Sequence, residues 1–167
     1  MTRLIFFLLL FVSLGTKAQV FRQNNRVAPD ETALAVQYYQ DGEYEKAAVI
    51  LEKIYARPNN EGYFDLYFST LIKLKKYDVA EKMVKKALKQ HPGDDLYLIA
   101  LGKLYQEKGE VQEANKYFLE AINKLPKDEF KIRNLANNFY RFENYDFAVQ
   151  TFNQGRKLLG NEQLFTF

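Results

Sequence analysis

The sequence has no cysteine, no tryptophan and a single histidine among its 167 residues. The lack of cysteine excludes disulfides, thiolate metal sites and a cysteine nucleophile. His91, in KQHPGDD, has no second histidine to complete a metal or catalytic site, and we interpret it as a last-turn cation near a helix C-terminus. A glycine-rich phosphate loop and a nucleophile elbow are absent too. We therefore expect a protein that is not an enzyme and needs no cofactor or metal.

The first eighteen residues follow the three-part pattern of a secretory signal peptide. A short basic start, MTR, precedes the uncharged run LIFFLLLFVSLG, and Thr16 and Ala18 occupy the small-residue positions before Gln19. The run is short for a membrane-spanning helix, which needs about 20 apolar residues. The alternative, a buried N-terminal helix, does not explain the flanking residues. We predict cleavage after Ala18, with the product in the periplasm or associated with the envelope, followed by a linker over residues 19–29.

The charge balance argues against nucleic acid as the main partner. The chain has 24 basic and 21 acidic residues, a net charge of +3, and loss of Arg3 and Lys17 with the signal would leave +1. Nucleic-acid binding requires a concentrated basic face rather than a near-neutral mixed surface.

A pattern of about 34 residues occurs four times. Tyr44, Tyr77, Val111 and Tyr145 mark equivalent positions, and each is followed three residues later by alanine, at Ala47, Ala80, Ala114 and Ala148. A larger apolar residue follows four positions after this alanine. The fourth and last position of the pattern comes three residues after that larger residue. Offsets of 3, 4 and 3 draw one apolar stripe along a helix, so each unit ends in an amphipathic helix.

A second amphipathic helix precedes each of these. In the third unit Leu98, Leu101, Gly102 and Tyr105 share one face. Asp30, Asp94 and Asp128 are predicted N-caps for these first helices. Pro58, Pro92 and Pro126 stop the second helices.

The turns between the paired helices need a left-handed residue. Gly42 and Gly109 suit that conformation, whereas Lys75 and Glu143 replace glycine in units two and four. In the fourth unit we expect Asn144 to take the left-handed role. Each unit is therefore a helical hairpin that must stack on the next to bury its apolar faces.

The third unit resembles the tetratricopeptide repeat (TPR) family. Its residues match the family pattern at Leu101, Gly102, Tyr105, Gly109, Ala114, Phe118, Ala121 and Pro126. Val111 stands where the family prefers tyrosine. The resemblance extends from about Ala28 to Gly160. It implies an all-α fold, an α-solenoid of about four TPR hairpins in a right-handed superhelix, with units at about 30–60, 61–94, 95–128 and 129–160.

Departures from the pattern cluster between units one and two. Ile54 and Phe68 stand where small residues are usual, and the first spacing is 33 rather than 34. We expect units one and two to pack farther apart or at a different angle.

The resemblance also implies a protein or peptide partner on the concave face, which the first helices line. The predicted contact residues are Tyr39, Gln40, Asp65, Lys73, Lys103, Gln106, Arg133, Asn137, Tyr140 and Arg141. The predicted groove side also includes Ser69, Ile72, Ile99 and Glu107. Arg133, Asn137, Tyr140 and Arg141 form a cluster suited to an acidic group beside an aromatic ring. Solvated polar groups on an ordinary helix remain an alternative for this cluster.

These residues favour a scaffold or adaptor in a cell-envelope complex. A spacer array without a groove ligand and a glycan- or peptidoglycan-associated helper remain alternatives. Tyr39 and Tyr140 could stack on sugars, although tryptophan, the usual platform, is absent.

The last seven residues, NEQLFTF, place Leu164, Phe165 and Phe167 as in the opening of a further first helix. We expect residues 161–167 to begin such a helix, with more TPR units or another domain C-terminal to Phe167. The alternative is that the short tail folds back over the last hairpin and closes it.

Overall fold

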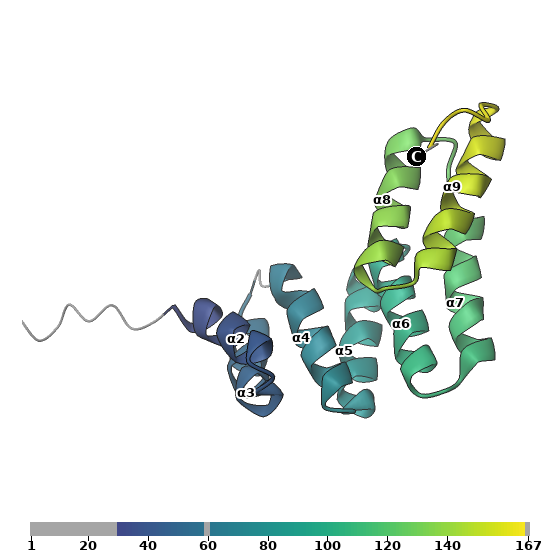
Figure 1. Cartoon of the computed structure of the whole chain (residues 1–167). Coiled ribbons are helices and arrows are strands. Elements are labelled where there is room, and N and C mark those ends of the chain that lie inside the picture. The colour runs from purple at the N-terminus through teal and green to yellow at the C-terminus, as the bar shows by residue number, and fades with distance from the viewer. Residues whose placement is uncertain (1–29, 59–60, 166–167) are drawn as a thin grey trace, which may run out of the picture.

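The computed structural model describes residues 30–58 and 61–165, which form eight α-helices, one short 3-10 helix and no strand. The predicted signal and linker lie outside the described residues. Figure 1 shows the helices as four consecutive antiparallel hairpins. The first helices are α2 (Glu31–Gln40), α4 (Phe64–Lys73), α6 (Asp95–Glu107) and α8 (Glu129–Arg141). The second helices are α3 (Tyr44–Tyr55), α5 (Tyr77–Gln90), α7 (Val111–Asn123) and α9 (Tyr145–Leu159).

The predicted N-caps are confirmed at three first helices. Asp30 accepts a hydrogen bond from the Thr32 backbone N–H, Asp94 from that of Leu96, and Asp128 from that of Lys131. The carboxylates thus satisfy amides that a helix start leaves unpaired. Helix α4 has no such cap, and the 3-10 helix η1 (Glu61–Tyr63) leads into it instead.

The four turns within the hairpins share one hydrogen-bond pattern. In each, a left-handed residue is followed by an amide that donates to the carbonyl five residues earlier, as from Glu43 to Tyr38 and from Asn144 to Phe139. This is the Schellman motif of helix C-termini. In the fourth turn the left-handed residue is Glu143, with φ of 62°, and not Asn144, whose φ is −96°. Asn144 is instead the N-cap residue of α9 and is buried, so our expectation that it would be left-handed was wrong.

The predicted apolar stripes form the core. Small residues lie where paired helices approach, and Ala35, Ala47, Ala80, Ala114 and Ala136 are buried. A Cβ at Gly102 would lie 2.2 Å from the Phe118 ring, which shows how closely α6 and α7 pack. Periodic burial along every hairpin confirms an all-α solenoid.

Unit two is the most open hairpin. Phe68 occupies the small-residue position of α4 and is buried, and α4 and α5 make the sparsest contact of the four pairs. Helix α3 packs against α4 as extensively as α5 packs against α6. The sparse contact therefore lies within unit two, and units one and two are no farther apart than units two and three.

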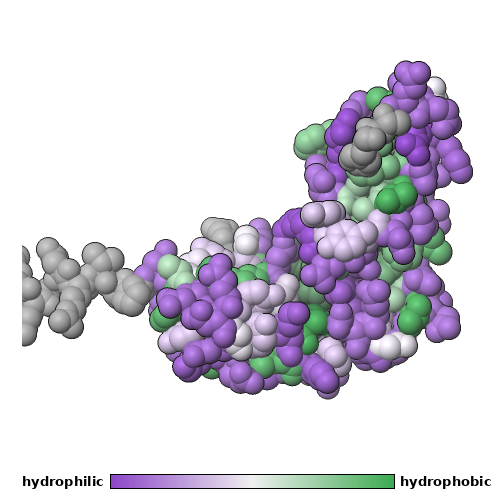
Figure 2. Space-filling model, in the orientation of Figure 1, coloured by the Kyte–Doolittle hydropathy of each residue, from purple (hydrophilic) through white to green (hydrophobic). Residues whose placement is uncertain are grey.

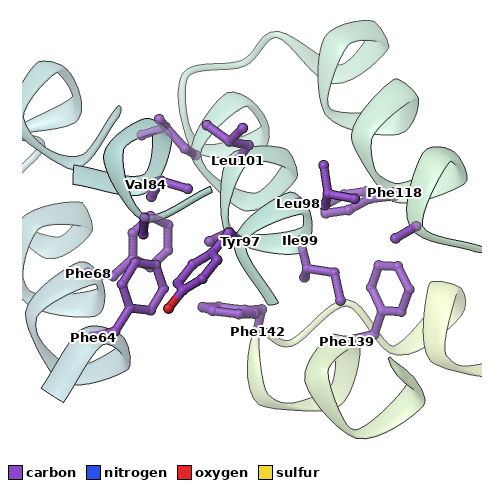
Figure 3. Packing of buried hydrophobic residues seen from close by; sticks show 14 of the residues in the cluster. Phe64, Phe68, Val84, Tyr97, Leu98, Ile99, Leu101, Phe118, Phe139 and Phe142 are labelled. Atoms are coloured by element: carbon purple, nitrogen blue, oxygen red, sulfur yellow. The ribbon is translucent and has the colours of Figure 1, made fainter. Parts of the chain in front are cut away.

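Unit four stands at an angle to the rest of the array (Figure 1). Helix α8 packs on α6 and α9 on α7, whereas α7 and α8 make little contact. The turn between α8 and α9 thereby reaches unit two, and Phe142 packs against Phe68 at a ring-centroid distance of 5.6 Å. In Figure 3 Phe142 lies close to the buried Phe64, Phe68 and Tyr97. Packing of α8 on α6 also buries Ile99, which we had expected to face the groove.

The described part of the tail turns back on the last hairpin. After the left-handed Gly160, residues 162–165 form a turn, and Phe165 is buried with its ring 4.8 Å from that of Phe152. Over these residues the chain follows the fold-back alternative rather than a further helix. Among the described residues, no helix has the length and apolar character needed to cross a membrane.

Candidate functional site

A hollow on the groove side lies between the first helices and the turn of unit four. We name it the central pocket; it has a volume of about 340 Å³. It is lined by Tyr39 of α2, by Phe68, Ser69, Ile72, Lys73, Lys75 and Tyr77 of unit two, by Lys103 and Glu107 of α6, and by Arg141, Phe142 and Glu143 of unit four. Four units thus contribute to one pocket.

The apolar part of the central pocket comes from units two and four. Phe68 and Phe142 meet edge to face with an interplanar angle of 86°, and Ile72 lies one helical turn beyond Phe68. Both phenylalanines are buried, so this contact is part of the core as well as the pocket. The pocket exists because unit four bends back over unit three.

Charged groups surround this apolar part. Lys103 Nζ lies 2.8 Å from Glu107 Oε1, and Arg141 forms an ion pair with Asp65. In the described part of the chain, Lys73 and Lys75 have no carboxylate within ion-pair distance. Glu143 likewise has no cation within that distance among the described residues. Unpaired charges of both signs therefore border the pocket.

A second hollow adjoins the central pocket. It has a volume of about 350 Å³ and shares Tyr39, Ser69, Arg141 and Phe142 with it, adding Asp65 and Leu66. The Asp65 Oδ1 atom is buried and has no hydrogen-bond donor among the described residues. The Arg141–Asp65 pair joins unit four to unit two at this point.

A third hollow, the end groove, lies between α8 and α9. It has a volume of about 380 Å³ and is lined by Arg133, Ala136, Asn137, Tyr140, Ala148 and Phe152. Arg133 donates two hydrogen bonds to Glu129 Oε1, at 3.0 and 2.7 Å, and its guanidinium lies 4.8 Å from the centre of the Phe165 ring. Arg133 is thus already paired, while Tyr140 is 66% exposed.

The predicted contact residues divide between these places. Tyr39, Asp65, Lys73, Lys103 and Arg141 lie at the central pocket or the hollow beside it. Arg133, Asn137 and Tyr140 line the end groove. Gln40 and Gln106 are exposed and border neither place. The structure therefore separates Arg141 from the cluster in which the sequence placed it.

Five residues that line the central pocket were not among our predicted groove residues: Phe68, Lys75, Tyr77, Phe142 and Glu143. Lys75 and Glu143 carry a visible signal, because each replaces the glycine of a repeated turn. Phe142 carries none, since its contact with Phe68 depends on the angle between units three and four.

The surface around His91 is mostly polar, unlike the central pocket with its two phenylalanines. It is a shallow hollow lined by His91, Asp94, Asp95, Lys131, Asn134 and Asn138 together with Pro92 and Gly93. His91 Nε2 lies 3.6 Å from Glu61 Oε1, and burial, aided by the nearby Asp94 carboxylate, raises the pKa of Asp95. No group of three or more metal-ligating side chains gathers within the described residues.

Comparison with known proteins identifies the family. A family model for the tetratricopeptide repeat matches residues 14–139. The chain belongs to the TPR family. A TPR repeat-containing protein of Methanocaldococcus jannaschii is 27% identical over 130 residues, which cover 76% of this chain and 22% of that protein. This TPR chain thus spans about a fifth of the length of that relative.

Solved structures of MamA have a similar arrangement of helices. MamA from Desulfovibrio magneticus RS-1, beginning at its residue 41, is 18% identical, with a TM-score of 0.48 over 80% of this chain and 76% of the other. Another MamA crystal structure is 15% identical, with a TM-score of 0.48 over 84% of this chain and 83% of the other.

Proposed function

We propose that this TPR protein is an exported scaffold or adaptor that holds a protein partner of a cell-envelope complex along its concave face. TPR repeats are protein-interaction modules, and membership of the family supports binding as the general role. The protein acts by binding alone, without catalysis. The proposed partner lies across the first helices.

The observation that carries this proposal is the central pocket. Four units contribute side chains to it, and three of the charged residues that line it, Lys73, Lys75 and Glu143, have no ion-pair partner among the described residues. A concave pocket with a few polar groups around an apolar floor is the usual form of a binding site. On the face that Figure 2 shows, hydrophobic residues form separate patches among hydrophilic ones.

Site-specific photo-cross-linking in cells tests the proposal. We expect a photoreactive residue at Ser69 or Ile72, both in the central pocket, to capture one discrete protein from the envelope fraction. The matched controls are Val49 and Val79, which are exposed on the second helices α3 and α5. The purified captured protein must then bind the purified TPR chain. Capture from the control positions alone, or from none, would contradict the proposal and favour a spacer array.

The end groove is the second part of the proposed contact. Replacing Arg133 and Tyr140 together by alanine is expected to weaken binding of the captured protein by about 2 kcal/mol, because arginine and tyrosine are frequent energetic anchors. Isothermal titration calorimetry measures the affinity. The control is the double variant Lys86→Ala/Lys89→Ala, whose side chains are exposed on α5. Equal affinities for both double variants would remove the end groove from the contact.

Export is part of the same proposal. It rests on the signal pattern in residues 1–18. Mass spectrometry of the protein from the periplasmic or envelope fraction is expected to find Gln19 as the first residue. A product there that still begins at Met1 would contradict it.

A further inference from the structure

The four hairpin turns have the same geometry but different residues at their left-handed position. Gly42 and Gly109 have φ of 76° and 81°, as suits glycine, whereas Lys75 and Glu143 have φ of 55° and 62°. A residue with a Cβ is disfavoured in this conformation, by about 1–2 kcal/mol. Two of the four turns therefore carry a backbone strain that glycine would remove.

The two strained turns border the same pocket. Lys75 and Glu143 both line the central pocket, and Gly42 and Gly109 do not. Residues held in unfavourable conformations concentrate at functional sites, where another requirement outweighs the strain. The side chains at both of these positions are charged.

The charges at the pocket have a definite arrangement. Lys75 and its neighbour Lys73 come from the end of α4, while Glu143 comes from the end of α8, and no ion pair joins the two turns. Phe68 of unit two and Phe142 of unit four contact each other and also line the pocket. Lys103 and Arg141 are already paired with Glu107 and Asp65. Among the described residues, the pocket thus has positive charges without an ion-pair partner on its unit-two side, a negative charge without one on its unit-four side, and an apolar contact that joins the two units.

We propose that the central pocket binds an extended protein segment in which an apolar side chain lies between an acidic and a basic residue. The apolar side chain enters beside Phe68 and Phe142, the acidic residue pairs with Lys73 and Lys75, and the basic residue pairs with Glu143. Opposite charges at the two edges fix the direction in which the segment lies. This rests on the proposed role of the concave face in binding a protein partner.

Peptide binding to the full chain tests the inference. The probes are amidated, acetylated peptides of glycine and serine that carry glutamate, phenylalanine and lysine in that order or in the reverse order, and a third in which serine replaces phenylalanine. In NMR titrations we expect one charge order to bind at least about tenfold more tightly than the other, with shifts at Ser69, Ile72 and Phe142. The probe without phenylalanine is expected to lose this binding. Absence of binding by every probe would overturn the inference.

Two variants separate binding from folding. Lys75→Gly and Glu143→Gly are each expected to raise the midpoint of thermal unfolding, because glycine relieves the strain, and to weaken the preferred probe several-fold. The double exchange Lys75→Glu/Glu143→Lys is expected to reverse the preferred charge order. The control is Lys76→Gln, an exposed neighbour of Lys75 that does not line the pocket.

The results also distinguish this inference from the proposed function. If Lys75→Gly and Glu143→Gly gain stability and leave probe binding and charge order unchanged, the inference is overturned. A partner that still cross-links to Ser69 or Ile72 in those variants would leave the general binding role intact.

Discussion

Small residues, glycine and alanine, allow the paired helices to approach closely. A Cβ on Gly102 would lie 2.2 Å from Phe118 Cε1 and 2.4 Å from Cδ1, and Phe118 is itself buried. The ring has no free space into which it can move, because it also packs against Phe139 and Phe147. Glycine at this position is therefore required by packing and not by backbone conformation.

Gly102→Ala is expected to lower the free energy of unfolding by about 1–2 kcal/mol. Overpacking a filled core costs about 1–3 kcal/mol, and the better helix propensity of alanine recovers up to about 1 kcal/mol. Urea denaturation followed by circular dichroism measures the change. Gly62→Ala is the control, because a Cβ there would meet no atom within 4 Å. A stability equal to that of the original chain would show that α6 and α7 can separate without loss.

At the scale of elements, Glu81 links units two and three. From α5 its Oε1 accepts hydrogen bonds from Lys85 Nζ at 2.6 Å and from the Tyr105 hydroxyl of α6 at 3.1 Å. Lys108 Nζ lies 3.7 Å from its other oxygen. The hydrogen bond from Lys85 holds the pKa of Glu81 below its usual range. The hydrogen bond from Tyr105 and the nearby lysine charges lower this pKa further. This carboxylate therefore stabilises the packing of α5 on α6 when it is ionised.

Glu81→Gln is expected to cost about 0.5–1 kcal/mol at about pH 7, in the range of a partly exposed ion-pair network. Because the folded-state pKa is lowered, the contribution is present above the unfolded pKa and is lost as the pH falls through the folded pKa. The two proteins should therefore converge in stability in acid, at pH values below the lowered folded-state pKa of Glu81. Denaturation at several pH values measures this. Glu120→Gln is the matched control, because its pair with Lys124 lies within α7 alone; an equal loss in that variant would show no benefit from joining two helices.

At the scale of the whole molecule, a contact between non-neighbouring units shapes the array. Repeats in a solenoid generally contact only their neighbours. Here Phe142 of unit four packs against Phe68 of unit two, and Arg141 pairs with Asp65 beside it. This contact joins the turn between α8 and α9 to unit two (Figure 3), and both rings line the central pocket.

Phe142→Ala is expected to cost about 3 kcal/mol, as for other buried phenylalanines, and to release unit four from unit two. Small-angle X-ray scattering should then show a larger radius of gyration, and unfolding should become less cooperative. Phe130→Ala is the control, because Phe130 is 68% exposed and lies on α8, the helix whose C-cap is Phe142. Unchanged scattering in Phe142→Ala would mean that the packing of α8 on α6 holds the angle by itself.

Local interactions explain why the sequence alone predicted much of this fold. The helices follow from apolar residues at helical spacing, their starts from Asp30, Asp94 and Asp128, and their ends from glycines and prolines. These signals act over a few residues, so they can be interpreted without knowing the fold. The same periodicity placed Tyr39, Asp65, Lys73, Lys103 and Arg141 on the side where the structure has the central pocket.

The angles between the hairpins were decided only by the tertiary structure. The sequence marked Phe68 as a departure from the repeat, but only the structure showed that the sparse contact lies within unit two, between α4 and α5. Burial of Ile99, the pairing of Arg141 with Asp65, and the part of Phe142 in the pocket all follow from the tilt of unit four. The contacts of Arg141 with Asp65 and of Phe142 with Phe68 join residues more than 70 positions apart, and they depend on the packing of complementary shapes, which a repeat pattern does not encode.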